Sequence, residues 1–296
     1  MCDHDVVEKI KKYTPSATFV FNEEKCTVAD FTSSNEIFVG SLRLLNQNDK
    51  TVVISLINKL KNLEVLNLRK NRLVNITDLS LPKLIHLDLS SNYLGVVPEW
   101  IKELNLEFLG LGVNNLLSIP DWIGSLTNLK VLKLHKNKIA DVQVIQNCKN
   151  LKFLNLYLNS MTQIPEFIFD LEHIEFFSWG LSSVESLSEK IENWKKLQYL
   201  SLVANKIKYL PDSICTLKNL IGLRVHKNEL QELPKNIGNL EKLEQISLYS
   251  NCLKSLPESF LNLKLKKCNL MYNNFVKHPI VKADWLCVDP EDCKWF

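Results

Sequence analysis

The sequence predicts an α/β solenoid, in which one short strand-and-turn unit is stacked on copies of itself. Three observations predict it: a recurring apolar phrase, an Asn at a fixed place in that phrase, and a formulaic segment between the copies. The phrase is Leu-x-x-Leu-x-Leu-x-x-Asn-x-Leu, repeated ten times between Leu63 and Phe275 at intervals of 21 to 23 residues. A period of this length indicates one supersecondary unit that buries its apolar side only by stacking.

The phrase predicts one short strand in each repeat. Leucines alternate with variable residues, so the leucines face one side of the strand and the variable residues face the other. The copies begin at Leu63, Leu84, Leu106, Leu129, Leu151, Ile174, Leu197, Leu220, Leu243 and Leu265.

The Asn at the ninth letter marks the place where the chain leaves the strand. Its amide both donates and accepts hydrogen bonds, so it can satisfy backbone groups that the turn would otherwise bury unpaired. Nine of the ten copies keep it, and the sixth copy has Ser182 instead.

The segments between the strands predict short α or 3₁₀ turns on the convex side. Many of them begin with Pro, which suits the first turn of a helix because it has no N–H to leave unsatisfied. An acidic residue that favours the positive end of a helix often follows: Glu99, Asp121, Glu166, Asp212 and Glu258. The segment after Asn71 is shorter and the one after Asn137 lacks the proline, so we expect an uneven convex surface.

The phrase resembles the 23-residue intracellular class of leucine-rich repeat proteins, such as Ras-suppressor, scribble and erbin-like chains. The shorter early repeats are similar to those of the leucine-rich regulatory subunit of protein phosphatase 1. The resemblance implies a leucine-rich repeat horseshoe with a parallel concave β-sheet of about ten strands and short α or 3₁₀ turns on its convex side. It also implies a protein that binds other proteins, although a fold by itself does not fix a function.

A stacked solenoid exposes apolar edges at both ends and needs caps. We expect residues 1–62 to form an N-terminal cap and a degenerate first repeat, 63–276 the ten repeats, and 277–296 a C-terminal cap. In the first part, 5–13 reads as an amphipathic helix, 17–21 and 36–45 as strands, and 48–62 as the degenerate repeat. In the last part, Trp285, Leu286, Trp295 and Phe296 either cover the final repeat or dock on a partner.

Composition indicates an intracellular protein in a reducing compartment. The chain is 46% hydrophobic, has no apolar run long enough to span a membrane, and starts with a charged segment rather than a secretory signal. Most of its eight cysteines are scattered, which favours free thiols, and Cys268 replaces a strand leucine as a small buried residue. A pairing of Cys287 with Cys293, or a zinc site that adds His278, stays open, although no C-x-x-C spacing supports the zinc site. We expect no cofactor and no metal.

The variable letters predict an electropositive concave face. The third, fifth, seventh and eighth letters of the ten copies give forty positions with one acid, Asp88. The basic positions are Arg69, Lys70, Lys133, Lys136, Arg224, Lys227 and Lys267, so the grid sums to +6 while the whole chain is only +3. Such a face would steer an acidic partner.

Aromatic residues lie between the basic positions of this grid, and aromatic anchors with basic flanks are typical of binding hot spots. The alternative is that the rings only pack across neighbouring strands. We predict a partner-binding set of Phe108, Lys133, His135, Lys136, Phe153, Tyr157, Phe176, Tyr199, Arg224, His226, Lys227 and Tyr249. Of these, we expect Phe153 and Phe176 to leave the core by alternation and to tolerate a charge.

The sixth copy departs from the phrase. Phe177 and Trp179 replace leucines and should face the core, and Ser182 can supply only part of the hydrogen bonding of an Asn. Either this is core drift in one repeat, or it bends the solenoid and shapes the centre of the binding surface.

The function predicted from these features is a non-catalytic scaffold or adaptor that binds an acidic, partly apolar protein on its concave face. No nucleophile elbow, phosphate-binding glycine loop or paired metal motif points to an enzyme, and nothing points to a small-molecule substrate or a membrane. A net charge of +3 and an isoelectric point near 8.3 are modest for nucleic-acid binding. A structural component of a larger assembly, such as a virus particle or a coat, would use the convex face and both ends.

Overall fold

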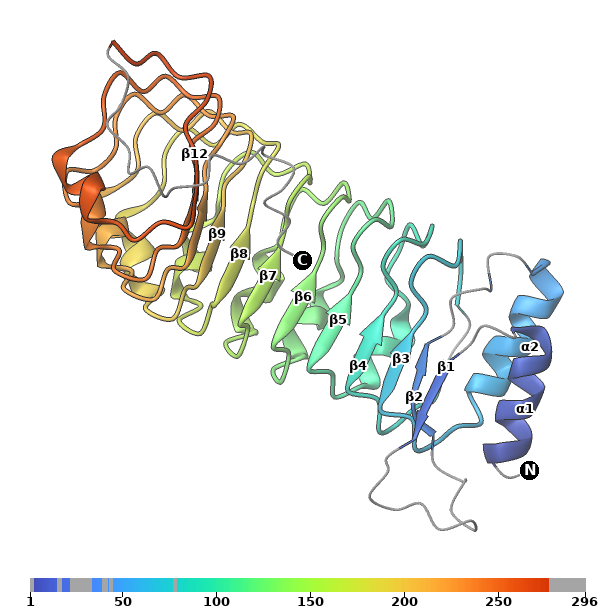
Figure 1. Cartoon of the computed structure of the whole chain (residues 1–296). Coiled ribbons are helices and arrows are strands. Elements are labelled where there is room, and N and C mark those ends of the chain that lie inside the picture. Colours follow the sequence, from blue (N-terminus) through green and yellow to red (C-terminus); the bar gives the residue numbers. More distant parts are fainter. Residues whose placement is uncertain are drawn as a thin grey trace. The chain divides into compact units, whose positions relative to one another are not determined.

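A computed structural model describes residues 3–14, 18–21, 34–38, 42, 45–76 and 79–276. The chain divides into two compact units, Met1–Asn150 and Leu151–Phe296, which are coloured blue to green and green to red in Figure 1. Within the described residues, every helix is too short or too polar to cross a bilayer.

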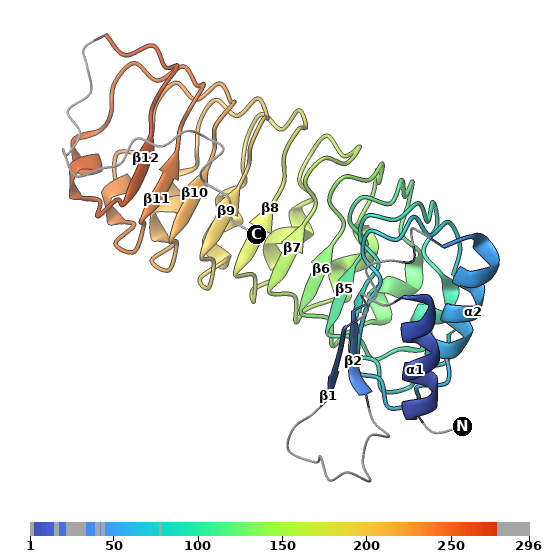
Figure 2. The same ribbon diagram turned by 45° about the vertical axis from the view of Figure 1, so that its right-hand side comes forward.

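The first unit begins with two helices and an antiparallel strand pair (Figure 2). Helix α1 (Asp3–Tyr13) packs against α2 (Gln47–Ile57), and α2 buries Val53, Ile54, Leu56 and Ile57. Strand β1 (Thr18–Phe21) pairs antiparallel with β2 (Ser34–Phe38). The helix expected at 5–13 and the strand expected at 17–21 are therefore confirmed, whereas β2 overlaps the strand expected at 36–45 only at residues 36–38. The segment 48–62, expected to be a degenerate repeat, contains α2 instead of a strand.

The rest of the first unit is a parallel sheet that continues from β2. Its strands are β3 (Val65–Asn67), β4 (His86–Asp88), β5 (Phe108–Gly110) and β6 (Val131–Lys133). The middle leucine of each strand lies beside the middle leucine of the next, from Leu66 to Leu132. These leucines are fully buried, as the alternation predicts.

The second unit carries six parallel strands in the same register. They are β7 (Phe153–Asn155), β8 (Phe176–Ser178), β9 (Tyr199–Ser201), β10 (Gly222–Arg224), β11 (Gln245–Ser247) and β12 (Lys267–Asn269). The two units together thus place one described strand in each of the ten predicted repeats. Cys268 is buried in the core of β12, as predicted.

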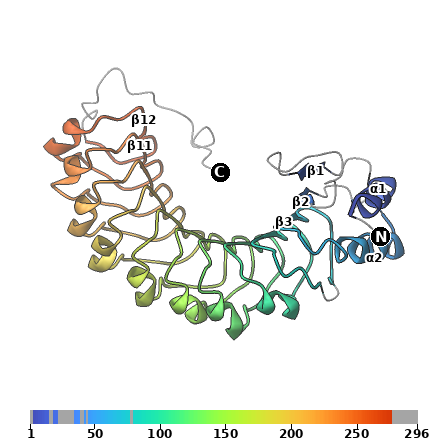
Figure 3. The ribbon, with the colours of Figure 1, turned by 90° about the horizontal axis from the view of Figure 1, so that it is seen from below.

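Short 3₁₀ helices follow the strands and lie on the opposite side of each unit from its sheet (Figure 3). The first unit has η3 (Glu99–Glu103), η4 (Asp121–Ser125) and η5 (Gln143–Asn147). The second has η6 (Glu166–Asp170), η7 (Glu189–Asn193), η8 (Asp212–Thr216), η9 (Ile237–Asn239) and η10 (Glu258–Asn262). Five of them begin at a predicted acidic residue, directly after a Pro in the N-cap position. Helix η5 forms without a proline, and the Gln143 N–H at its start donates to the Asp141 carboxylate at 2.8 Å.

The repeated Asn satisfies backbone groups in its own repeat and in the preceding one. The Asn228 amide donates to the Leu202 and Val225 carbonyls at 2.9 and 3.0 Å, and its oxygen accepts from the Ile207 N–H at 3.1 Å. Asn92, Asn114 and Asn137 make equivalent bonds in the first unit. The role predicted for this residue is therefore confirmed.

The sixth repeat keeps its strand register but changes its core. Phe177 and Trp179 face the interior, as predicted, and are at most 1% exposed. They belong to an aromatic cluster in which Trp194 lies 4.8 Å from Phe177 and 5.0 Å from Phe169, centroid to centroid. Strand β8 pairs with β7 and β9 without a register shift. The larger rings are thus accommodated by packing with the 3₁₀ side rather than by a change in strand pairing.

Candidate functional site

The side of each sheet that faces away from the leucine core carries the third, fifth and seventh letters of the phrase. We call this side the sheet face, and we describe it separately in each unit. The eighth letters form its rim, because the chain turns there toward the Asn.

Every eighth letter lies in the left-handed backbone region, with φ between 51° and 62°. This region is unfavourable for residues other than glycine, and most of all for β-branched ones. Three of these residues are nevertheless large and apolar: Val113, Leu158 and Leu181, which are 37%, 37% and 46% exposed. The left-handed turn therefore presents apolar side chains at the rim in both units.

The sheet face of the first unit centres on Phe108. The His86 ring stacks on it, with centroids 3.8 Å apart and planes 7° from parallel, and the Lys133 ammonium lies 5.0 Å from its centroid. A cation over an aromatic face is attracted by the ring quadrupole. Burial lowers the pKa of Lys133, and Asp88 opposes this effect.

Two glycines of the third repeat let neighbouring side chains lie flat on the sheet. A Cβ at Gly110 would collide with the Asp88 carboxylate, and one at Gly112 would collide with the His135 ring. Burial, followed by Lys133 and Lys136, lowers the pKa of His135 to about 4. This imidazole is therefore neutral at pH 7, and its buried Nδ1 has no hydrogen-bond partner. The acid of the face, Asp88, is only 6% exposed.

In the second unit, Phe153 and Phe176 stack face to face, with centroids 4.1 Å apart and planes 5° from parallel. Tyr199 occupies the next register position. Phe153 and Tyr199 are half-buried, but Phe176 between them is only 8% exposed. Phe176 leaves the leucine core as predicted, but its neighbours cover it, so a charge at this position would be largely buried.

Tyr157 occupies the seventh letter of the repeat that carries Phe153. Its ring approaches Gly180 so closely that a Cβ there would meet the ring carbons at 2.9 and 3.0 Å. Burial raises the pKa of the Tyr157 hydroxyl. The glycine thus lets an aromatic ring lie flat across the sixth repeat.

Further along the second unit, basic and aromatic residues meet. His226 and Tyr249 are 6.4 Å apart, and Tyr249 and Tyr272 are 5.1 Å apart, both edge to face. Burial, followed by Arg224 and Lys227, lowers the pKa of His226 to about 4. As with His135, the Nδ1 of His226 is buried without a hydrogen-bond partner.

The twelve predicted residues fall into two sets. Phe108, Lys133, His135 and Lys136 lie on the first unit, and the other eight lie on the second. Three pairs of them are in contact in the structure: Lys133 lies over Phe108, Phe153 stacks on Phe176, and His226 meets Tyr249 edge to face. The prediction omitted the polar fifth letters of the second unit, although their composition is readable from the sequence: Asn155, Ser178, Ser201, Ser247 and Asn269.

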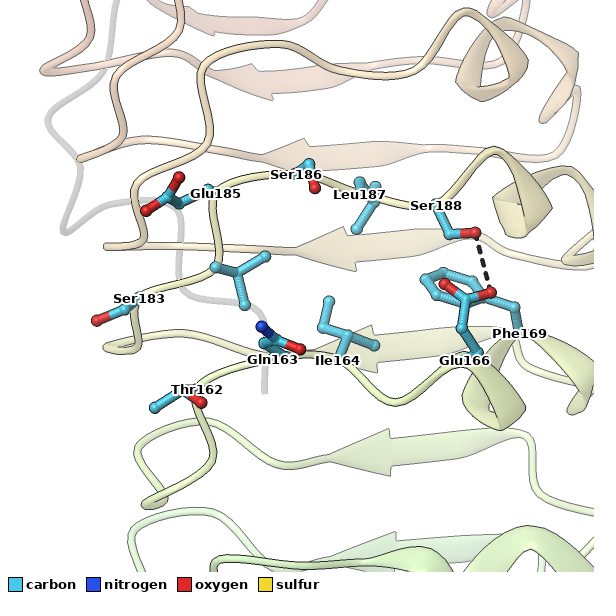
Figure 4. Close-up of a pocket in the computed structure, with 11 residues that line it drawn as sticks. Thr162, Gln163, Ile164, Glu166, Phe169, Ser183, Glu185, Ser186, Leu187 and Ser188 are labelled. Carbon is cyan, nitrogen blue, oxygen red and sulfur yellow. Dashed lines mark hydrogen bonds between the residues drawn. The ribbon is translucent and has the colours of Figure 1, made fainter.

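A hollow of about 560 Å³ lies away from the sheet face, between the segments that follow strands β7 and β8 (Figure 4). It is lined mainly by polar residues, and the Ser188 hydroxyl donates to the Glu166 carboxylate at 3.2 Å. Its lining includes Ser183, which follows Ser182 in the chain, and the Ser182 hydroxyl donates to the Met161 carbonyl at 2.5 Å. This carbonyl is not one that the Asn of the other repeats uses, since Asn228 donates to the Leu202 and Val225 carbonyls and accepts from the Ile207 N–H. The partial replacement of the Asn bonds by Ser182 therefore stays a prediction.

Comparison with protein families identifies the repeats. A family model described as a leucine-rich repeat region matches residues 166–267, and a leucine-rich repeat model matches residues 83–104. Sequence comparison with curated proteins gives no match.

Solved structures of leucine-rich repeat proteins are similar to this chain. A leucine-rich repeat protein of Leptospira interrogans is 31% identical, with a TM-score of 0.61 over 74% of this chain and 69% of that one. The leucine-rich repeat ectodomain of an Arabidopsis thaliana membrane receptor kinase, solved with Casparian strip integrity factor 2, is 28% identical with a TM-score of 0.60. That match covers 74% of this chain but only 31% of the ectodomain. An internalin of Listeria monocytogenes shares the fold at 19% identity and a TM-score of 0.56, covering 92% of this chain and 90% of that one.

The chain belongs to the leucine-rich repeat family. Proteins with this fold typically act as scaffolds for protein–protein interactions and are generally non-catalytic. Among the described residues, no group of three or more His, Cys, Asp or Glu side chains is placed to hold a metal ion. The proposed residues of a zinc site or disulfide, His278, Cys287 and Cys293, lie outside the described residues, as do the C-terminal aromatics.

Proposed function

We propose that this protein is a non-catalytic scaffold or adaptor whose sheet face binds an acidic, partly apolar protein. The observation that carries the proposal is the composition of the face in the second unit. Its twenty-four variable positions hold Arg224, Lys227, Lys267 and several aromatic rings, and no acid. An acidic partner would meet no like charge on this surface, and its apolar groups would contact the rings.

The first unit supports the same proposal with a smaller patch. Lys133 and Phe108 pair a cation with an aromatic face, while the acid of this face is buried. The Arabidopsis ectodomain, which matches this chain over 74% of its length, was solved with a protein ligand. This likeness supports a protein partner, and the charge of the face supports an acidic one.

The proposal includes the compartment. We place the chain in the 23-residue intracellular class on the phrase quoted above, with a reducing, cytoplasmic environment. The free thiols of Cys148, Cys215 and Cys252 support it, because disulfides are rare in a reducing compartment.

A crosslinking pull-down from the native source tests the proposal. Phe153→Glu places a charge in the aromatic row of the second unit and should remove a partner that the intact chain recovers. Phe167→Glu is the matched control, because the same substitution then falls in η6, on the 3₁₀ side of the same unit.

The two variants distinguish binding by the sheet face from binding by the 3₁₀ side or the ends. Loss of the partner with Phe153→Glu alone supports binding by the sheet face. Loss with Phe167→Glu alone, or equal recovery with both variants, contradicts it and favours an assembly component that uses the 3₁₀ side or the ends. Circular dichroism and thermal unfolding of both variants show whether they remain folded.

A further inference from the structure

We propose that the first unit attaches to an anionic lipid surface through the loops that follow β3, β4, β5 and β6. The inference goes beyond the proposed function, because it concerns a different surface and a different class of partner. It describes contact with the surface of a membrane, not passage through it. Composition alone does not indicate this contact, since the side chains that carry it are scattered in the sequence.

Four large apolar side chains project from these loops. In the described part of the chain they are the most exposed large apolar side chains outside the last repeat: Val74 (67%), Tyr93 (53%), Val96 (74%) and Leu117 (67%). Single exposed apolar residues are ordinary on a protein surface, but these four belong to three consecutive repeats. A group of this kind marks an interaction surface, and we call it the flank patch.

Hydrogen bonds between neighbouring loops hold the flank patch together. The Tyr93 N–H donates at 2.7 Å to the carbonyl of Leu73, the residue before Val74. The Gly95 N–H donates at 3.0 Å to the Asn114 carbonyl in the following repeat. The backbone therefore fixes the loops side by side, and their apolar side chains form one surface.

Basic residues accompany the flank patch. In the first four repeats, the eighth letter and the four residues after it include no acid, whereas the same segments of the second unit include Glu185 and Glu229. In the ranges that the structure describes, no salt bridge neutralises the basic residues of the four segments. These exposed residues are Lys70, Arg72, Lys136 and Lys138.

This combination matches an anionic bilayer. Apolar side chains enter the boundary between headgroups and acyl chains, and cations are attracted by anionic lipids. A tyrosine ring suits the same boundary, because one end of it is apolar and the other is polar. Each side chain of the patch has more than half of its surface exposed, so it protrudes rather than lining a hollow.

Two other occupants fit less well. A second copy of this chain, docked symmetrically, would place the same four cations opposite one another, and like charges oppose that contact. A protein partner holds its anchor residues in well-packed pockets, which protruding side chains do not provide. A fluid bilayer accepts protruding side chains without a matching shape.

Flotation of the full chain with lipid vesicles tests the inference. We expect the chain to float with phosphatidylcholine vesicles that contain about one third phosphatidylserine, and to bind pure phosphatidylcholine at least about tenfold more weakly. Added salt should weaken the binding to the anionic vesicles, because it screens the attraction between cations and headgroups.

A pair of charge substitutions locates the contact. Arg72→Gln with Lys138→Gln should weaken binding to the anionic vesicles about 10- to 30-fold, since each cation near an anionic surface contributes about fivefold. The matched control is Lys206→Gln with Lys208→Gln, which removes two exposed cations from the equivalent loop of the second unit. The control pair should change the binding less than about twofold.

The apolar side chains are tested in both directions. Val96→Ser with Leu117→Ser should weaken binding about tenfold or more, because less apolar surface enters the bilayer. Val52→Ser with Leu261→Ser is the matched control, since it changes the same residue types at exposed positions outside the patch. Val96→Trp should strengthen binding, because Trp is favoured at the membrane interface. Thermal unfolding shows whether each variant is folded.

Several results would overturn the inference. They are the absence of binding by the intact chain to the anionic vesicles, equal binding to both kinds of vesicle, or equal losses for a patch pair and its control. Loss of a protein partner or of a dimer with the patch substitutions, without any vesicle binding, would show that the flank patch is a protein interface instead. None of these outcomes decides the proposed function, which Phe153→Glu tests on the second unit.

Discussion

At the scale of single residues, the rim shows a conflict between side chain and backbone. Val113 is β-branched, yet its φ is 60° because the repeat turns at this letter whatever residue occupies it. Its N–H donates to the His135 carbonyl at 2.8 Å, so the conformation is fixed by pairing with the next repeat. A left-handed conformation costs an ordinary residue roughly 1–2 kcal/mol.

Replacing this residue tests the conflict. Val113→Gly should leave the free energy of unfolding unchanged or raise it by about 1 kcal/mol, because glycine adopts positive φ freely. Val131→Gly, in strand β6, is the control and should lower it by roughly 1–2 kcal/mol. Urea unfolding followed by circular dichroism measures both. An equal loss for the two variants would show that the rim conformation is not strained.

The two face histidines predict how stability depends on pH. His135 and His226 have folded-state pKa values of about 4 against 6.5 for the free group, so the unfolded chain binds more protons between these values. Their contribution to stability is complete above about pH 6.5 and is lost as pH falls toward 4. Because both rings are only part-buried, we expect roughly 1–2 kcal/mol for each.

The measurement is the free energy of unfolding at pH 7.5 and pH 5.0. The intact chain should lose stability over this range, and His135→Gln with His226→Gln should lose less. The control is His173→Gln, because that ring is at the surface and bonds to Lys196. If the double variant keeps the full pH dependence of the intact chain, these histidines are not its source.

At the scale of elements, the hydrogen bonds of the repeated Asn connect a repeat to the one before it. The sixth repeat interrupts this series because it has Ser182 in place of the Asn. Ser182 reaches a single carbonyl, and the Oδ1 of Asn205 in the next repeat is buried without a hydrogen-bond partner. The equivalent oxygen of Asn228 accepts a backbone N–H of the preceding repeat. The hollow of Figure 4 lies along the same interrupted segment.

The Asn bonds predict opposite changes in the free energy of unfolding for substitutions at two positions. Asn228→Ser should lower the free energy of unfolding by roughly 2–4 kcal/mol, since it leaves buried backbone groups unpaired. Ser182→Asn should raise it by about 1 kcal/mol by restoring the repeat's bonds. Asn239→Ser, at the exposed end of η9, is the control for the first substitution. Urea unfolding distinguishes them, and a destabilising Ser182→Asn would indicate that the sixth repeat has adapted to serine.

At the scale of the whole chain, charge is distributed unevenly between the sheet faces and the remaining surface. The forty variable positions sum to +6 in a chain of net charge +3, so the rest of the chain sums to −3. Several lysines outside the faces are paired with acids of neighbouring repeats, as Lys130 is with Glu107 at 2.8 Å. The net charge of the face positions has the sign that would steer an acidic partner.

Reversing the face charges should slow association with the partner. Lys133, Lys136, Arg224 and Lys227 changed together to Glu should reduce the association rate by roughly 10-fold or more at low salt and leave the circular dichroism spectrum unchanged. Surface plasmon resonance at several salt concentrations measures this effect. A complete loss of binding to nucleic acid with rising salt, and no protein partner, would instead indicate a phosphate-binding surface.

The sequence by itself determined the fold and the orientation of most side chains. Ten copies of one phrase leave no other arrangement that buries all the leucines, and strict alternation places Phe153 on the face and Leu154 in the core. The bonding of the repeated Asn and the buried position of Trp179 follow from the same period. These features are local, because each depends only on the position of a residue within its own repeat.

Only the tertiary structure decided what depends on neighbouring repeats. Phe176 is covered because Phe153 stacks on it, His135 lies flat because residue 112 of the preceding repeat is a glycine, and α2 occupies a segment that the phrase could not resolve. The polar fifth letters of the second unit likewise become one row only when the strands pair in register. The exposure of a side chain on the face depends on the residue at the same position in the neighbouring repeat, about 22 residues away in the sequence. The pattern within one repeat therefore does not predict it.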